Sequence, residues 1–266
     1  MVVDVMNEAP QKVSASLVVY GVLVVIFLLM PIVIAAVVAF NAGERAAFPP
    51  EGFSLRWFYS VLGSDLLMDG LYKSLIIAVA STAIATVCGT CAAVALNHYR
   101  FGGRAVVQTV IMMPIALPAI VLGLGLLFAT PLYGMSIGLL PATLGHAVLG
   151  IPYVAAMVLA ALGSFDRSLE RASLNLGVGP IRTFLNVTLP HIKTGVVAGA
   201  VASFLLSLDN ISLSLFVTRN DTMPLRLMQH MLSYTDPSVA AMSVMLLLAS
   251  FVLLLMLLPI VSQRRR

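Results

Sequence analysis

Residues 17–40 read LVVYGVLVVIFLLMPIVIAAVVAF, a run of 24 residues without a charged side chain. A helix rises about 1.5 Å per residue, so roughly 20 residues cross a hydrocarbon core of about 30 Å. The run is long enough to span a bilayer and longer than the apolar part of a usual signal peptide. We interpret it as a retained membrane span.

Five further apolar stretches follow the first, at residues 74–96, 106–130, 139–163, 194–217 and 239–261. The whole chain of 266 residues is 60% hydrophobic and 10% charged, whereas a soluble domain carries about a quarter charged residues. This composition excludes a soluble enzyme and predicts an all-α membrane protein with six transmembrane helices. We expect the third and fourth helices to be interrupted, because they contain Pro114, Pro118, Pro141 and Pro152.

The basic residues indicate which loops are cytoplasmic. If the N-terminus is inside, ten basic residues fall on the inner side and five on the outer side, which favours cytoplasmic N- and C-termini by the positive-inside rule. The net charge of +4 reflects these short loops, so we expect no nucleic-acid partner. The inner set is Lys12, Arg100, Arg104, Arg167, Arg171, Arg182, Lys193, Arg264, Arg265 and Arg266.

The segment 164–193 between the fourth and fifth spans has a helical order of its own. Phe165, Leu169, Ala172 and Leu176 recur at spacings of four, three and four, which puts them on one helix face. Gly177 can end that helix with a positive φ, and the proline at position 180 can begin a second one. Such an apolar face either lies on the bilayer surface or docks into a groove on a partner.

Two motifs in this segment resemble a known family. Residues 170–177 read ERASLNLG and residues 187–190 read VTLP; together they resemble the EAA loop of binding-protein-dependent ABC importer permeases. Arg171 stands where the family pattern has its first alanine. Residues 96–104, LNHYRFGGR, are similar to the family's Leu-x-Arg-Tyr-x-Phe-x-Gly-Arg inner turn, and Met113-Pro114 with Leu117-Pro118 fits its proline-rich third span.

This resemblance implies a type I importer permease fold in a bacterial plasma membrane. Residues 1–70 would form an N-terminal span and outer loop, residues 71–261 the core with its coupling loop at 164–193, and residues 262–266 a basic tail. The implied partners are a second permease subunit, homologous or identical, two cytoplasmic ABC ATPases and an outer solute-binding protein. The residues implied to contact the ATPase are Glu170, Arg171, Ala172, Leu176, Gly177, Leu189 and Pro190.

The chain is not expected to be an enzyme. It has no Walker A sequence, so ATP and Mg²⁺ would be bound by the partner ATPase, and this chain would hold no cofactor. The four histidines are far apart, and Cys88 and Cys91 lie inside an apolar stretch, where packing is the simplest role. We therefore assign no catalytic residue and no metal ligand.

One formally charged side chain lies inside the six apolar stretches, and it is Asp209. A carboxylate at membrane depth normally faces a cavity and has a partner. In a continuous helix Ser207, Asn210 and Ser214 share a face, so we predict that these residues and Asp209 line a solute pathway. The alternative is an internal hydrogen-bond cluster between helices.

The stretch LSLDN at 206–210 resembles permeases of the spermidine/putrescine branch, and TMPL at 222–225 is similar to that branch's outer loop. A polycation in a low-dielectric region needs a counter-charge, so the hypothesis is an importer of polyamines. The same scaffold could carry ferric iron or an organic anion. An ion-coupled secondary transporter is a further alternative, but it would need more than one ionisable group within the membrane.

Overall fold

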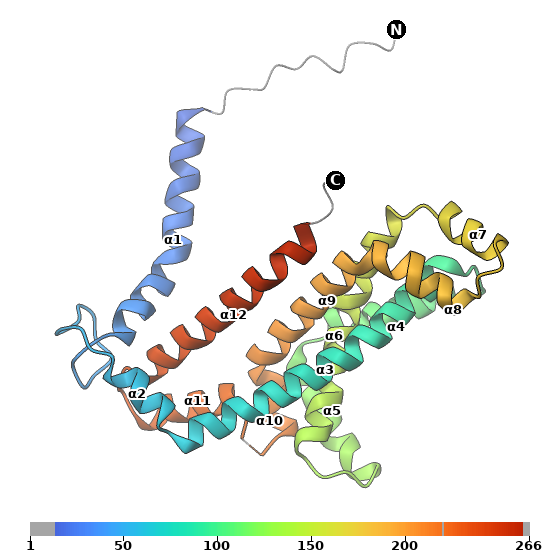
Figure 1. Cartoon of the computed structure of the whole chain (residues 1–266). Coiled ribbons are helices and arrows are strands. Elements are labelled where there is room, and N and C mark those ends of the chain that lie inside the picture. The colour runs from blue at the N-terminus through green and yellow to red at the C-terminus, as the bar shows by residue number, and fades with distance from the viewer. Residues whose placement is uncertain (1–13, 220, 263–266) are drawn as a thin grey trace. The chain divides into compact units, whose positions relative to one another are not determined.

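The computed structural model describes residues 14–219 and 221–262, and in the last helix it describes side chains up to Met256. Lys12 and the three arginines of the basic tail therefore lie outside the described residues. The described part is helical, with one isolated β-bridge between Asn41 and Phe53 and no named strand. The elements, coloured along the chain in Figure 1, are α1 (Ala15–Ala39), α2 (Arg56–Leu62), α3 (Asp65–His98), α4 (Arg104–Ala116), α5 (Ala119–Leu132), α6 (Leu139–Gly163), α7 (Ser168–Asn175), α8 (Pro180–Thr183), the π-helical turn η1 (Phe184–Thr188), α9 (Leu189–Asp209), α10 (Ile211–Val217), α11 (Met223–Ser233) and α12 (Ser238–Ser262).

The predicted all-α membrane fold is confirmed. Among the described residues, five helices are long and apolar enough to cross a membrane, and a bent pair, α4 with α5, makes up to six. The chain direction bends by 104° between α4 and α5. The bend lies at Leu117, which is extended at φ −86° and ψ 132°, because a following proline disfavours helical backbone.

The expectation that prolines interrupt both the third and the fourth span was wrong for the fourth. Helix α6 runs without a break from Leu139 to Gly163 and contains Pro152 within it. Pro141 lies in the first turn of α6, where a backbone N–H has no helical partner to lose. The break in the third span lies at Leu117 and Pro118, between α4 and α5, whereas Pro114 stays inside α4.

The fifth span is interrupted where the sequence predicts continuity. Helix α9 ends at Asp209, Asn210 has φ −81° and ψ 91°, and α10 begins at Ile211. The Asn210 side-chain oxygen accepts a hydrogen bond from the Leu213 N–H at 2.9 Å. Asparagine is a favoured N-cap because its side chain satisfies an N–H that the helix leaves free. Asn210 thus starts a second helix instead of continuing the first.

The chain divides into two compact units, and the first comprises residues up to 60 together with 235–245. Its described part holds α1 and the loop that follows it. Asn41 organises this loop: its side-chain oxygen accepts from the N–H groups of Gly43 and Glu51 at 3.0 Å each. The Trp57 indole N–H donates to the Asn41 carbonyl at 2.9 Å. One buried asparagine therefore replaces the regular hydrogen bonds that the loop lacks.

The second unit, residues 61–234 and 246–266, contains the helices that build the candidate site. Within it, α3, α6 and α9 pack against one another around a core that includes Ala85, Val154 and Val158 (Figure 1). The packing is close at Gly199 of α9, where an added Cβ would lie 2.7 Å from the Val154 Cα. Membrane helices gain association energy from such close approach at small residues, since lipid removes the hydrophobic drive between helices.

We therefore predict that Gly199→Ala separates α9 from α6 and destabilises the detergent-solubilised protein by about 1–3 kcal/mol, the usual cost of overpacking. Thermal unfolding of the purified chain measures this. The matched control is Gly125→Ala in α5, where an added Cβ meets nothing within 4 Å and alanine gains up to about 1 kcal/mol of helix propensity. Equal melting temperatures for the two variants would contradict the packing account.

Candidate functional site

The coupling segment, defined as residues 164–193, turns sharply at Gly177. Gly177 has φ +82°, its N–H donates to the Leu174 carbonyl at 3.0 Å, and the Val178 N–H donates to the Ser173 carbonyl at 3.2 Å. These two bonds with a left-handed glycine form a Schellman motif, which closes a helix C-terminus. Helix α7 therefore ends as the sequence predicts, and the chain turns into α8.

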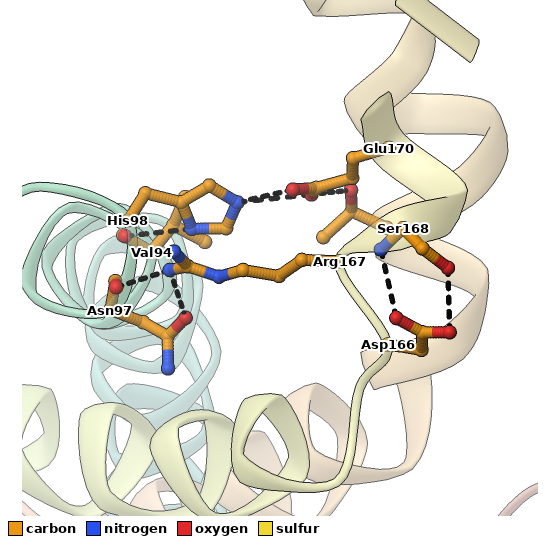
Figure 2. A network of polar contacts seen from close by, with 8 residues as sticks. Val94, Asn97, His98, Asp166, Arg167, Ser168 and Glu170 are labelled. Atoms are coloured by element: carbon orange, nitrogen blue, oxygen red, sulfur yellow. Dashed lines mark hydrogen bonds and ion pairs between the residues drawn. The ribbon is translucent and has the colours of Figure 1, made fainter. Parts of the chain in front are cut away.

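The coupling segment is attached to the C-terminal end of α3 by two polar links (Figure 2). The Glu170 carboxylate of α7 lies 2.7 Å from the His98 Nε2 and also accepts from the Thr188 hydroxyl of η1. In the second link, the Arg167 guanidinium before α7 donates to the Asn97 backbone carbonyl of α3 and, at 2.6 Å, to the Asn97 side-chain oxygen. The sequence singled out Glu170 but not its partners on α3 and η1.

Asp166, before α7, holds the turn that leads into the segment. The Ser168 N–H and hydroxyl donate to its two carboxylate oxygens at 2.8 and 2.6 Å. The hydroxyl bond first, and then the backbone bond, lower the pKa of Asp166 below its usual range. The turn is therefore capped at neutral pH.

The apolar residues of the coupling segment do not all share one surface. Phe165 and Leu189 pack against the core of α3, α6 and α9, whereas Leu176 is 84% exposed and Ile181 is 75% exposed. Of the remaining predicted contact residues, Arg171, Ala172, Gly177 and Pro190 are exposed and Glu170 is half-buried. Large exposed apolar side chains on both arms of the Gly177 turn leave a surface that a partner or lipid can cover.

A groove lies at the other end of α9, at the break in the fifth span. Its volume is about 620 Å³, and its polar lining consists of Asp209, Asn210, Ser212 and Tyr153 of α6, among alanine, leucine and isoleucine side chains. The Asp209 side chain is exposed in the isolated chain. The groove is thus lined by one carboxylate and one phenol ring, and no sequence pattern pointed to Tyr153.

Ser207 and Ser214, predicted to line the same pathway, lie instead in a buried cluster around His146. Their hydroxyls lie 2.8 Å from the His146 Nδ1 and 3.1 Å from its Nε2, respectively. Ser81 of α3 donates to the Ser207 hydroxyl at 3.3 Å. His146 is 3% exposed. One imidazole therefore joins α6 to both halves of the interrupted span, because Ser207 belongs to α9 and Ser214 to α10.

The loop before α11 contacts the N-terminal part of α3. The Met223 N–H donates to the Ser74 hydroxyl at 2.8 Å, and the Lys73 ammonium lies 2.8 Å from Asp69 and 3.3 Å from Asp221. This contact fixes the loop before α11 at the end of α3 opposite to His98. Within the described residues, no group of three or more histidine, cysteine, aspartate or glutamate side chains could hold a metal ion.

We predict that His146→Leu destabilises the protein by about 1–2 kcal/mol, because two buried hydroxyls lose their partner and turn back to their own helix carbonyls. His146→Gln, which keeps a donor and an acceptor, should recover part of this loss. Thermal unfolding in detergent measures both variants. A His146→Leu protein as stable as the wild type would show that the cluster does not hold the break together.

Comparison with known proteins places this geometry in a family. Residues 85–266 match the family described as "Binding-protein-dependent transport system inner membrane component". The spermidine/putrescine transport system permease protein PotC of Escherichia coli (strain K12) is 31% identical over 231 residues, which cover 86% of this chain and 87% of PotC. The putrescine transport system permease protein PotI of the same strain is 30% identical over 251 residues, covering 91% and 89%.

Solved structures support the same fold. The chain resembles a subunit of a bacterial ABC transporter involved in the import of the acidic polysaccharide alginate, with a TM-score of 0.67 at 17% identity, covering 97% of this chain and 100% of that one. The family match spans more than half of the described helices, including the coupling segment and the groove. The chain belongs to the family of binding-protein-dependent transport system inner membrane components and is the permease component of an ABC importer.

Proposed function

We propose that this permease carries a polyamine of the spermidine/putrescine class and that a separate cytoplasmic ATPase, seated on the coupling segment, drives it. The chain would work as a multi-pass protein of a bacterial inner membrane with both termini in the cytoplasm. A second permease subunit would complete the pathway, and an outer binding protein would deliver the solute. ATP and Mg²⁺ would be held by the ATPase partners.

The observation that carries the solute assignment is the Asp209 carboxylate in the groove at the break between α9 and α10. A cation that leaves water for a low-dielectric pathway needs an opposite charge close by. Tyr153 lines the same groove, and the face of an aromatic ring attracts an ammonium group. The apolar remainder of the lining suits the methylene chain between the amino groups of a polyamine.

The names of the relatives support the same solute class. PotC and PotI are permeases of spermidine/putrescine and putrescine transport systems, and both align with most of this chain. The carboxylate groove gives a physical reason for a cationic solute that does not depend on those names.

The ATPase assignment rests on the exposed apolar side chains around the Gly177 turn. Leu176 and Ile181 lack cover in the isolated chain, and an apolar projection of this kind fits into a groove on a partner. The 21 residues of α9 extend over about 30 Å at 1.5 Å per residue, from the coupling segment to the groove. A displacement of the segment can therefore reach Asp209 through one helix.

In this mechanism the ATPase changes the balance between two states of the permease. Nucleotide binding would close the ATPase pair, move both coupling segments and favour the state in which the groove faces outward. Loss of nucleotide would favour the inward state. Such a shift requires only that the ATPase bind the two states with different affinity.

We predict that Asp209→Asn lowers the initial rate of spermidine uptake at least roughly tenfold, since a charge-assisted contact contributes about 1.5–3 kcal/mol. Asp209→Glu, which keeps the charge, should retain much of the uptake. Labelled spermidine is measured in cells that lack their own polyamine importers and express the complete system, with equal permease levels in the membrane.

The matched control is Asp65→Asn, which removes an exposed carboxylate at the start of α3, outside the groove, and should leave uptake unchanged. Unchanged spermidine uptake in Asp209→Asn would contradict the solute assignment. Uptake of ferric iron or of an organic anion, without uptake of polyamine, would replace it.

We predict that Gly177→Val weakens retention of the ATPase roughly tenfold, because a side chain in the left-handed region costs about 1–2 kcal/mol. Gly179→Val is the matched control, because Gly179 has φ −63° and an added Cβ meets nothing within 4 Å at either glycine. Co-purification of the ATPase with the membrane-inserted permease measures retention. Equal retention in both variants would contradict docking on this turn.

A further inference from the structure

His98 has an unusual set of hydrogen-bond partners, because both of its ring nitrogens face acceptors. Its Nδ1 lies 3.1 Å from the Val94 carbonyl oxygen. Its Nε2 lies 2.7 and 3.0 Å from the two carboxylate oxygens of Glu170. A neutral imidazole has one N–H and one bare nitrogen, so it can satisfy one of these contacts as a donor but not both.

Each of the two contacts of the His98 ring needs a hydrogen of its own. The Val94 carbonyl can only accept, so this contact is a hydrogen bond only with a hydrogen on Nδ1. An ionised carboxylate can also only accept, so the contact between Nε2 and Glu170 needs a second proton, either on the ring nitrogen or on the carboxyl group. Both contacts are hydrogen bonds at the same time only if the pair holds one proton more than a neutral histidine beside an ionised glutamate. The Thr188 hydroxyl donates to Oε1 of the same carboxylate.

This pair is partly shielded from water and joins three elements. The His98 and Glu170 side chains are 22% and 13% exposed, so their contact is screened less than one between fully exposed groups. His98 ends α3, Glu170 lies in α7, and Thr188 lies in η1 directly before α9. The contact between His98 and Glu170 ties the coupling segment to α3 (Figure 2). Thr188, directly before α9, bonds the same carboxylate.

We propose that His98 is a positioning residue of the importer: the proton shared between His98 and Glu170 clamps the coupling segment to α3 and makes the attachment depend on pH. The consequence for ATP-driven uptake rests on the proposed function, but the clamp itself is a property of this chain. Protonated, the pair holds α7 and η1 against α3. When the proton leaves, the neutral ring can donate to only one of its two acceptors, Val94 or Glu170, and the attachment weakens.

The other charged groups nearby do not replace His98. Arg167 donates to Asn97, so it links the segment to α3 through an amide and not through Glu170. Arg171 of α7 and Arg182 of α8 are exposed, and Asp166 is bonded to Ser168. Residues 184–188 of η1 contain no ionisable side chain, and His191 of α9 lies with its Nδ1 2.6 Å from the Val187 carbonyl.

Hydrogen exchange of residues 168–188, measured by mass spectrometry on the assembled transporter in lipid nanodiscs without nucleotide, tests the clamp. After correction for the intrinsic exchange rate, wild-type protection should fall roughly tenfold between about pH 6 and about pH 9, the effect of one charge-assisted hydrogen bond. His98→Arg, which keeps a charge at every pH, should remain protected throughout. His98→Gln should show the low protection over the whole range.

Protection of the α6 core serves as the folding control and should not differ among the variants. A common pH profile in wild type and His98→Arg, or full protection in His98→Gln, would overturn the clamp. Solute-stimulated ATP hydrolysis, measured on the same samples, should follow the protection of the segment. Absence of stimulation by any polyamine, with the exchange pattern intact, would reject the proposed solute and leave the clamp standing.

Discussion

Irregular backbone at membrane depth is the constraint on which the site depends. In lipid, a peptide group without a helical partner has no water to bond, so a broken helix persists only where protein or a wet cavity satisfies it. The fifth span breaks at Asn210, whose side chain caps α10. His146 bonds a serine on each side of the break, and the open face of the break lines the groove that contains Asp209. The break therefore borders both the groove that contains Asp209 and the buried cluster around His146.

The two candidate regions, the coupling segment and the groove, lie at opposite ends of α9. At one end, the coupling segment is attached to α3 through Glu170 and Arg167 and presents Leu176 and Ile181 outward. At the other end, α9 stops at Asp209. Close packing at Gly199 keeps α9 against α6 along the way. The 21 residues of α9 extend over about 30 Å, which is the distance over which the proposed motion of the ATPase would act on the groove.

Sequence patterns predicted the features that depend on local chemistry and missed those that depend on distant partners. The length of the apolar runs was enough to locate the spans. Gly177 indicated the end of α7, because glycine adopts a positive φ without the steric cost that a side chain adds. The Asn210 break was missed, since polar residues after an apolar run are compatible with a continuous helix. Ser207 and Ser214 find their partner 61 and 68 residues away in His146, and no local pattern shows that contact. Pro118 broke its span while Pro152 did not, so a proline in an apolar run does not by itself predict a break.

In the proposed mechanism, nucleotide on the ATPase changes the groove at the Asn210 break. Because the described chain has two free cysteines, Cys88 and Cys91, their replacement by alanine gives a background in which Ser212→Cys reports on the groove. Labelling of this cysteine by a membrane-impermeant thiol reagent, added from the outside of the assembled transporter, is compared without nucleotide and with ATP trapped on the ATPase. The account predicts faster outside labelling in the ATP-trapped state and slow labelling without nucleotide. The same labelling rate in both states would contradict coupling between the segment at 164–193 and the groove.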